Sequence, residues 1–292
     1  MGGPVAGATR ALLADGRLHF QHGPIDLIID ADGDAAALAA AHAAAWERFG
    51  EVLRELVSEL GVLRRPVGPA TFAAGPVARC MIDACRPFAL HPFELFITPM
   101  AAVAGAVAEE IAAHYHRPGI GRAYVNNGGD IALVLTPGSR YDIGVVSDPL
   151  RGSLDGAISV SAESGIRGIA TSGWHGRSFS LGIADSVTVL ARTAAQADAA
   201  ATLVANAVNA EHPAVRRAPA CSIKDDTDLG ERLVTIAVDT LPGAVVDAAL
   251  ARGRAFAQEL CAGGLIIAAW LTLQGRGRAV GQDHRVQIME AA

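Results

Sequence analysis

The sequence is poor in cysteine, lysine, aromatic residues and charge. Its 292 residues include four cysteines and one lysine, Lys224, with 5% aromatic and 18% charged residues. Four cysteines are too few for a disulfide scaffold in a chain of this length, and Cys80 and Cys85 are not at CxxC spacing, so we interpret all four as ordinary thiols. Because 51% of the residues are hydrophobic, the composition excludes an intrinsically disordered chain.

Long apolar runs and basic stripes are also missing. No apolar run approaches the ~18 residues of a membrane-spanning helix. The net charge of −6 comes without a cluster of arginines, which excludes a nucleic-acid partner. The N-terminal segment has no basic start followed by an apolar stretch, so we expect a cytoplasmic protein. These absences leave a small-molecule ligand as the expected partner, with homo-oligomerisation left open.

The pattern of strands and helices predicts an α+β fold in one domain, residues 1–292. A hairpin at Leu18–Asp30 precedes a long helix at Asp34–Leu60, which we expect Gly61 to stop. Four prolines between Thr71 and Pro99 predict loops and short helical turns there. Further helices are expected at Met100–His114, Ala194–Asn209 with Thr193 as N-cap, and Ala244–Leu260. Strands are expected at Ala123–Asn126, Ile131–Leu135, Tyr141–Val146, Ala157–Ser161, Gly168–Thr171, Ser186–Ala191, Leu233–Val238 and, finally, Leu265–Leu273.

The segment Asn126-Asn127-Gly128-Gly129-Asp130 brings bare backbone to a tight turn between two predicted strands. Such a turn could approach a ligand closely. Asn-Gly is also the commonest short hairpin sequence, so a simple turn is the alternative interpretation.

Three other patterns could carry chemistry. Thr171-Ser172-Gly173 ends a strand with hydroxyl and backbone donors for a phosphate or carboxylate, or is a plain connection. Asp198 and Thr202 lie four residues apart, so they share a helix face that could hold a hard cation, although an acidic residue early in a helix also stabilises the helix itself. His175 follows closely in the loop after Gly173, and a lone histidine is more often structural than catalytic.

The order of these motifs resembles the FAD:protein FMN transferases, the ApbE proteins, whose fold of antiparallel sheets packed with helices is related to the T-fold. The resemblance runs from about Ala101 through NNGGDI, ATSG and SVTV to the D-x-x-x-T helix at about Val208. It implies FAD or FMN as cofactor and Mg²⁺ as metal. It places Asn126, Asn127, Gly128, Gly129, Asp130, Thr171, Ser172 and Gly173 at the flavin, and Asp198 and Thr202 at the metal, with a backbone carbonyl of 103–105 as a third ligand.

The departures from that family indicate a divergent branch. Ala104-Gly105 stands where the transferases have Lys-Gly, and their H-x-x-D-P motif is absent. His175 and Asp185 could replace its histidine and carboxylate as catalytic residues, although neither aligns by motif. The function therefore stays open between FMN transfer, FAD hydrolysis, and an enzyme or binding protein for another heteroaromatic metabolite such as a pterin or one-carbon carrier.

Overall fold

The computed structural model describes residues 7–90, 92–145, 156–281 and 287–290. It divides the chain into two compact units. Unit 1 comprises residues 1–140, 161–169 and 192–198, and unit 2 comprises residues 141–160, 170–191 and 199–292.

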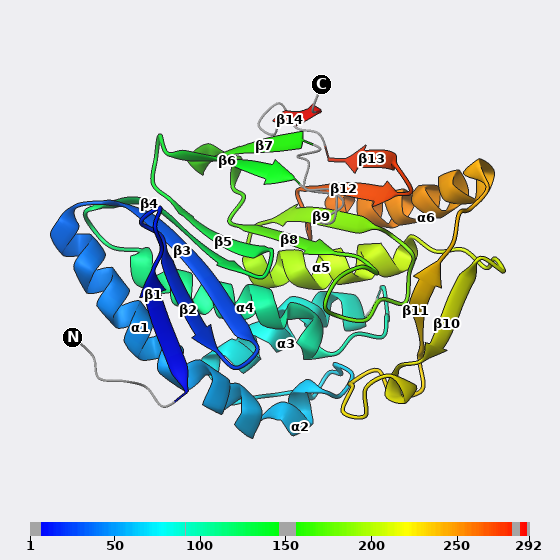
Figure 1. Ribbon diagram of the computed structural model, residues 1–292, viewed down its shortest axis with the longest axis horizontal. Helices are drawn as coiled ribbons and strands as arrows, with labels where there is room; N and C mark the ends of the chain where they lie inside the picture. The colour runs from blue at the N-terminus through cyan, green and yellow to red at the C-terminus, as the bar shows by residue number, and fades with distance from the viewer. Residues whose placement is uncertain (1–6, 91, 146–155, 282–286, 291–292) are drawn as a thin grey trace. The chain divides into compact units, whose positions relative to one another are not determined.

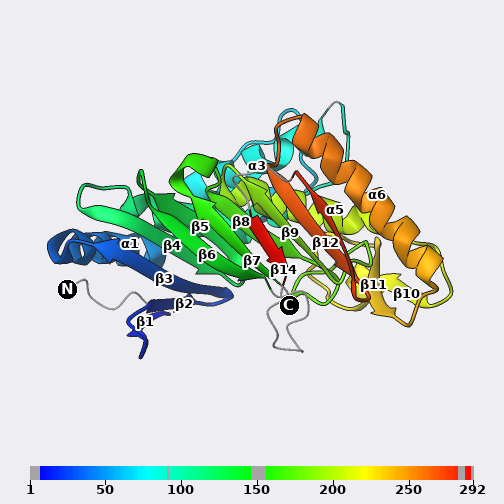
Figure 2. The same cartoon turned by 90° about the horizontal axis from the view of Figure 1, so that it is seen from above.

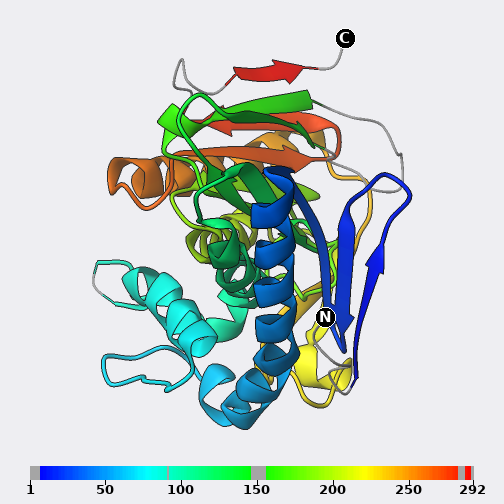
Figure 3. The same cartoon turned by 90° about the vertical axis from the view of Figure 1, so that its left-hand side faces the viewer.

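Unit 1 is an antiparallel sheet with helices packed against it. The strands follow one another as neighbours in the order β1 (Ala8–Leu12), β2 (Leu18–His22), β3 (Ile25–Gly33), β4 (Ile120–Asn127) and β5 (Asp130–Leu135), and β5 also pairs with the first residues of β8 (Gly168–Ser172). The helices are α1 (Ala35–Ser58), α2 (Leu60–Leu63), α3 (Pro76–Ala89) and α4 (Val103–Ala112), with 3-10 helices η1 (Pro99–Ala102), η2 (Ala113–Tyr115) and η3 (Ala162–Ser164). The long helix α1 runs beside the β2–β3 hairpin, as Figure 3 shows in blue.

An aromatic cluster joins α1 to this sheet. Phe20 of β2 lies edge-on to Trp46 with ring centroids 5.1 Å apart, and tilted against Phe49 at 5.4 Å. All three side chains are buried. Ala41, Ala45, Trp46, Phe49, Val52 and Leu56 form the buried stripe of α1, so hydrophobic burial as well as the helix propensity of alanine holds this helix.

Unit 2 contains three sets of antiparallel strands. β9 (Ser186–Ala191), β12 (Ala268–Leu273) and β13 (Arg276–Val280) pair in that order beside the end of β8, and α6 (Gly243–Ala262) packs on β12 and β13. Figures 1 and 2 show α6 in orange beside these strands. The other strands are β10 (Val215–Pro219) with β11 (Leu233–Val238), and β6 (Arg140–Val145), β7 (Gly156–Ser161) and β14 (Gln287–Glu290), with the 3-10 helix η4 (Ala220–Ser222). α5 (Ala194–Ala207) begins in unit 1 and continues in unit 2.

The α+β prediction is confirmed, as are most element positions, and the Thr193 hydroxyl accepts the N–H of Gln196 as expected of an N-cap. Val146, the last residue of one predicted strand, lies outside the described residues. Gly61 does not end the helical region, because α2 follows α1 directly. Leu265–Leu273 is not the final strand, because β13 and β14 follow it.

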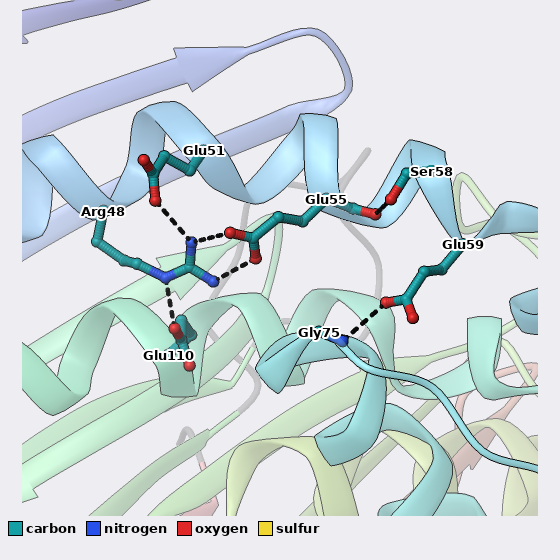
Figure 4. A network of polar contacts seen from close by, with 7 residues as sticks. All are labelled: Arg48, Glu51, Glu55, Ser58, Glu59, Gly75 and Glu110. Carbon is teal, nitrogen blue, oxygen red and sulfur yellow. Dashed lines mark hydrogen bonds and ion pairs between the residues drawn. The ribbon is translucent and has the colours of Figure 1, made fainter.

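The prediction of loops and short helical turns over Thr71–Pro99 is wrong in one respect, because α3 occupies Pro76–Ala89 as one continuous helix of 14 residues. Pro76 stands at the start of the helix, where its missing N–H is not needed. The Glu59 carboxylate accepts the N–H group of Ala74 at 2.6 Å and that of Gly75 at 3.0 Å, and Figure 4 shows the contact with Gly75. These contacts satisfy donors at this end of α3. A partner 15 or more residues away thus helps to fix a helix in a proline-rich segment.

A cluster of charged side chains links α1 to α4 (Figure 4). The Arg48 guanidinium donates to both Glu55 oxygens at 2.8 and 2.7 Å and to Glu110 at 2.5 Å. Only 14% of the Arg48 side chain is exposed. These carboxylates raise the pKa of Arg48, so the residue is a permanent cation that the glutamates neutralise.

Candidate functional site

The turn Asn126–Asp130 is the hairpin connection between β4 and β5, and its backbone is conformationally unusual. Asn127 pairs with Asp130, and the two glycines between them have φ angles of 67° and 114°. The Asn126 side-chain oxygen accepts the Gly129 N–H at 2.8 Å, which closes the turn. No heavy atom outside its chain neighbours lies within 4 Å of where a Gly129 Cβ would be, so the bare backbone faces open space.

Asn127 ties this turn to helix α4. Its side chain is 6% exposed, and its amide nitrogen donates to the Ala104 carbonyl at 3.1 Å. A buried amide needs such a partner, so the contact fixes the turn against the first residues of α4. This asparagine therefore positions the turn.

Asp198, in the unit 1 portion of α5, is also joined to the start of α4. Its Oδ2 accepts the Gly105 N–H at 3.0 Å. That N–H belongs to the first turn of α4, where backbone donors have no partner within the helix. Burial and the negative charge of Asp130 raise the pKa of Asp198 well above its usual value, against the opposing effect of the hydrogen bonds from the backbone of Gly105 and Ala104. Two carboxylates and the end of a helix thus meet within unit 1.

Gly105 itself is required by the close approach of α4 to the start of α5. A Cβ at this position would lie 2.3 Å from the Ala194 carbonyl oxygen and 2.8 Å from the Ala195 nitrogen. Only a glycine fits there without a shift of the backbone. This packing explains the glycine of Ala104-Gly105 independently of any ligand.

In unit 2, His175 and Asp185 lie close together, although no sequence motif joins them. His175 Nε2 is 3.5 Å from Asp185 Oδ1, which also accepts the Trp174 indole N–H at 3.3 Å. The Trp174 and His175 ring centroids are 3.8 Å apart. Asp185 Oδ2 accepts the Gln274 N–H at 2.5 Å. The carboxylate is therefore held on both oxygens, and it holds the histidine in turn.

These residues border a cavity of about 800 Å³ within unit 2. Trp270, Gln274 and Arg276 also line this cavity, and no sequence motif pointed to them. The one local indication was the Gln274-Gly275 pair at the turn between β12 and β13, where both residues have positive φ, 46° and 75°.

Thr171, Ser172 and Gly173 also belong to unit 2. The Thr171 hydroxyl lies 2.9 Å from the Thr188 hydroxyl of β9. A Cβ at Gly173 would lie 2.2 Å from the Asp185 carbonyl oxygen, so this glycine permits the loop to pass close to Asp185.

The predicted site residues therefore divide between the units. Asn126–Asp130 and Asp198 belong to unit 1, whereas Thr171–Gly173, His175, Asp185 and Thr202 belong to unit 2. Their assignments as cofactor-binding, catalytic and metal-binding residues stay predictions. Within the described ranges, no three histidine, cysteine or acidic side chains gather in a way that could hold a metal ion. No helix of the described part of the chain is both long and apolar enough to cross a membrane.

This chain belongs to the family described as "AbpE bacteria", whose model matches residues 10–280. The chain is 35% identical over 218 residues to a UPF0280 protein of Methanopyrus kandleri, covering 73% of this chain and 84% of that relative. It is 37% identical over 139 residues to a UPF0280 protein of Methanospirillum hungatei, covering 47% and 54%. Among solved structures, it is similar to the apo form of the Pseudomonas stutzeri flavinyl transferase ApbE, with a TM-score of 0.48 and 13% identity over 97% of this chain and 94% of that one.

Proposed function

We propose that this protein is a divalent-cation-dependent enzyme that cleaves the pyrophosphate of a flavin dinucleotide, with Asn126–Asp130 and Asp198 of unit 1 in its binding site. The observation that carries the proposal is the hydrogen bond of 3.0 Å from the Gly105 N–H to Asp198 Oδ2, which joins residues 93 positions apart in sequence. The negative charge of Asp130 acts on the same carboxylate. The motif order that resembles the FMN transferases supports a flavin as substrate.

The donors suit a hard cation. Asp130 and Asp198, both in unit 1, offer carboxylate oxygens. Mg²⁺ prefers such oxygen ligands, and a cation between two carboxylates would offset both the burial and the repulsion by Asp130 that raise the Asp198 pKa. A bound dication would supply neutralisation of charge on the phosphate oxygens.

The residues of the chain would position the nucleotide. Gly128 and Gly129 carry no side chain, so phosphate oxygens could approach the backbone of the turn. Asn127 would keep that turn fixed through its bond to Ala104. In the reaction, a P–O bond of the FAD pyrophosphate breaks, AMP leaves, and FMN passes to water or to a protein hydroxyl, which gives up its proton.

The test is a cation titration of the full chain with FAD. We expect Mg²⁺ or Mn²⁺ together with FAD to raise the melting temperature and to release AMP, measured by mass spectrometry. Asp198→Asn should lose both effects, whereas Asp83→Asn should retain them because the Asp83 side chain is 74% exposed on α3.

Two results would contradict the proposal. One is the absence of a thermal shift with FAD, FMN or ADP in the presence of Mg²⁺. The other is saturable FAD binding without any AMP or FMN product, which would indicate a binding protein.

A further inference from the structure

The lining of the unit 2 cavity includes the indole ring of Trp270. Trp270 of β12 lies across Gly277 of β13, and a Cβ at Gly277 would be 2.5 Å from the indole Cζ2. The glycine thus lets the indole lie close to the strand. Indole rings stack on other planar rings with offset geometry, so Trp270 offers a surface for a flat ligand.

His175 presents one ring nitrogen at the edge of this cavity. Because Nε2 faces Asp185 Oδ1 at 3.5 Å, the carboxylate favours the tautomer that carries its proton on Nε2. Nδ1 is then an acceptor, and no side chain of the described residues forms a hydrogen bond with it. The His175 side chain is 41% exposed, so a ligand can reach it.

A positive charge is available at the same cavity. Arg276 lines it and forms an ion pair with Asp247, whose other oxygen accepts from Arg278 at 2.8 Å. Two guanidinium groups therefore share the Asp247 carboxylate, which leaves one positive charge uncompensated within this group of three, while Asp185 is the acidic residue of the cavity lining. Arg276 also donates to the Gly243 carbonyl at 3.2 Å, which limits its movement.

We propose that this cavity binds a planar heteroaromatic molecule with an anionic substituent. Its ring stacks on Trp270, a ring N–H donates to His175 Nδ1, and the anionic group lies near Arg276. A cavity of about 800 Å³ suits a ligand of two or three fused rings. The site needs no divalent cation and none of the unit 1 residues, so it goes beyond the proposed flavin dinucleotide cleavage and can fail independently of it.

The test measures tryptophan fluorescence in the full chain with EDTA present. The probes are pterin-6-carboxylate and FMN, each compared with its uncharged counterpart, pterin and riboflavin. The three tryptophans are Trp46, Trp174 and Trp270, and only Trp46 lies outside the cavity. We expect saturable quenching by at least one anionic probe, retained in Trp46→Phe and reduced in Trp270→Phe. Binding of either ring class supports the proposal only where the quenching depends on Trp270, whereas FMN binding that Trp270→Phe leaves unchanged belongs to the flavin site proposed in unit 1 and contradicts this one.

Arg276→Gln tests the anionic group. Loss of one charged contact should weaken the anionic probe about tenfold, while its uncharged counterpart should bind as before. Arg79→Gln, an exposed arginine of α3, is the control. If Trp270→Phe does not fold by circular dichroism, Trp174→Phe replaces it. The proposal is wrong if no probe saturates, or if both Trp270→Phe and Arg276→Gln bind the anionic probe like the unchanged protein.

Discussion

Replacement of Gly105 by alanine should destabilise the protein, although alanine is the better helix former. The new methyl group would lie 2.3 Å from the Ala194 carbonyl oxygen, 2.6 Å from its carbonyl carbon and 2.8 Å from the Ala195 nitrogen. All three are backbone atoms, so no rotamer change can relieve the contact. Either α4 or the start of α5 has to move.

The magnitude follows from two opposing effects. Alanine gains about 1 kcal/mol over glycine inside a helix. Overpacking costs about 1–3 kcal/mol. Because the atoms that the new methyl group meets belong to the backbone and cannot change rotamer, we expect a cost at or above the upper end of this range. We therefore expect a net loss of about 2 kcal/mol and a fall in melting temperature of about 5 °C. The same shift would pull the Gly105 N–H away from Asp198, so cation binding should weaken as well.

Thermal and urea unfolding followed by circular dichroism measure this loss. The matched control is Gly61→Ala in α2, where no atom lies within 4 Å of the added Cβ, so its stability should be unchanged or higher. If Gly105→Ala melts within about 1 °C of Gly61→Ala, the close packing of α4 on α5 does not exist as described.

Three further predictions concern charge and thiols. Arg48→Gln should lower the free energy of unfolding, measured in urea, by about 3 kcal/mol because carboxylates at a partly buried site lose their cation. Glu51 is the control, because its side chain is 56% exposed and its Oε2 lies 3.6 Å from Arg48 Nη1. Glu51→Gln should lower the free energy of unfolding by less than about 0.5 kcal/mol. Because the pKa of Asp198 is raised, the folded chain keeps a proton that the unfolded chain releases. With EDTA present, the melting temperature of the unchanged protein relative to that of Asp198→Asn should therefore fall as the pH rises above about 4 and become constant above the folded pKa. A melting-temperature difference that stays the same at every pH would contradict this. Burial raises the pKa of Cys80 to about 12, so its thiol is protonated and unreactive in the folded protein at pH 8. Cys80→Ser should therefore leave the number of thiols that react with a disulfide reagent unchanged in the folded protein. In urea, the same substitution should lower that number by one.

The features that the sequence predicted correctly depend on neighbours along the chain. Asn126–Asp130 was predicted as a turn between strands because two glycines follow two asparagines there, and it is the β4–β5 hairpin. The helix predicted at Ala194–Asn209 with Thr193 as its cap is α5, Ala194–Ala207. Propensity, alternation and capping act over a few residues, so a sequence displays them directly.

The prediction failed where distant partners decide the structure. The prolines of Thr71–Pro99 indicated loops and short helical turns, but burial of Met81 and Phe88 and the cap from Glu59 stabilise a longer helix. Such contacts come from residues that are brought together only by folding, and local propensity is too weak to oppose them.

The same distinction applies to the candidate sites. The sequence by itself indicated the Asn126–Asp130 turn, Asp198 and His175 as candidates, and its motif order pointed to the family and, through it, to Asp185. Only the tertiary structure placed Asp198 at the Gly105 N–H, and His175 with Asp185 at a cavity beside Trp270. The reason is physical: a hydrogen bond between residues 93 positions apart depends on how helices pack and strands pair, and neither leaves a mark in local sequence.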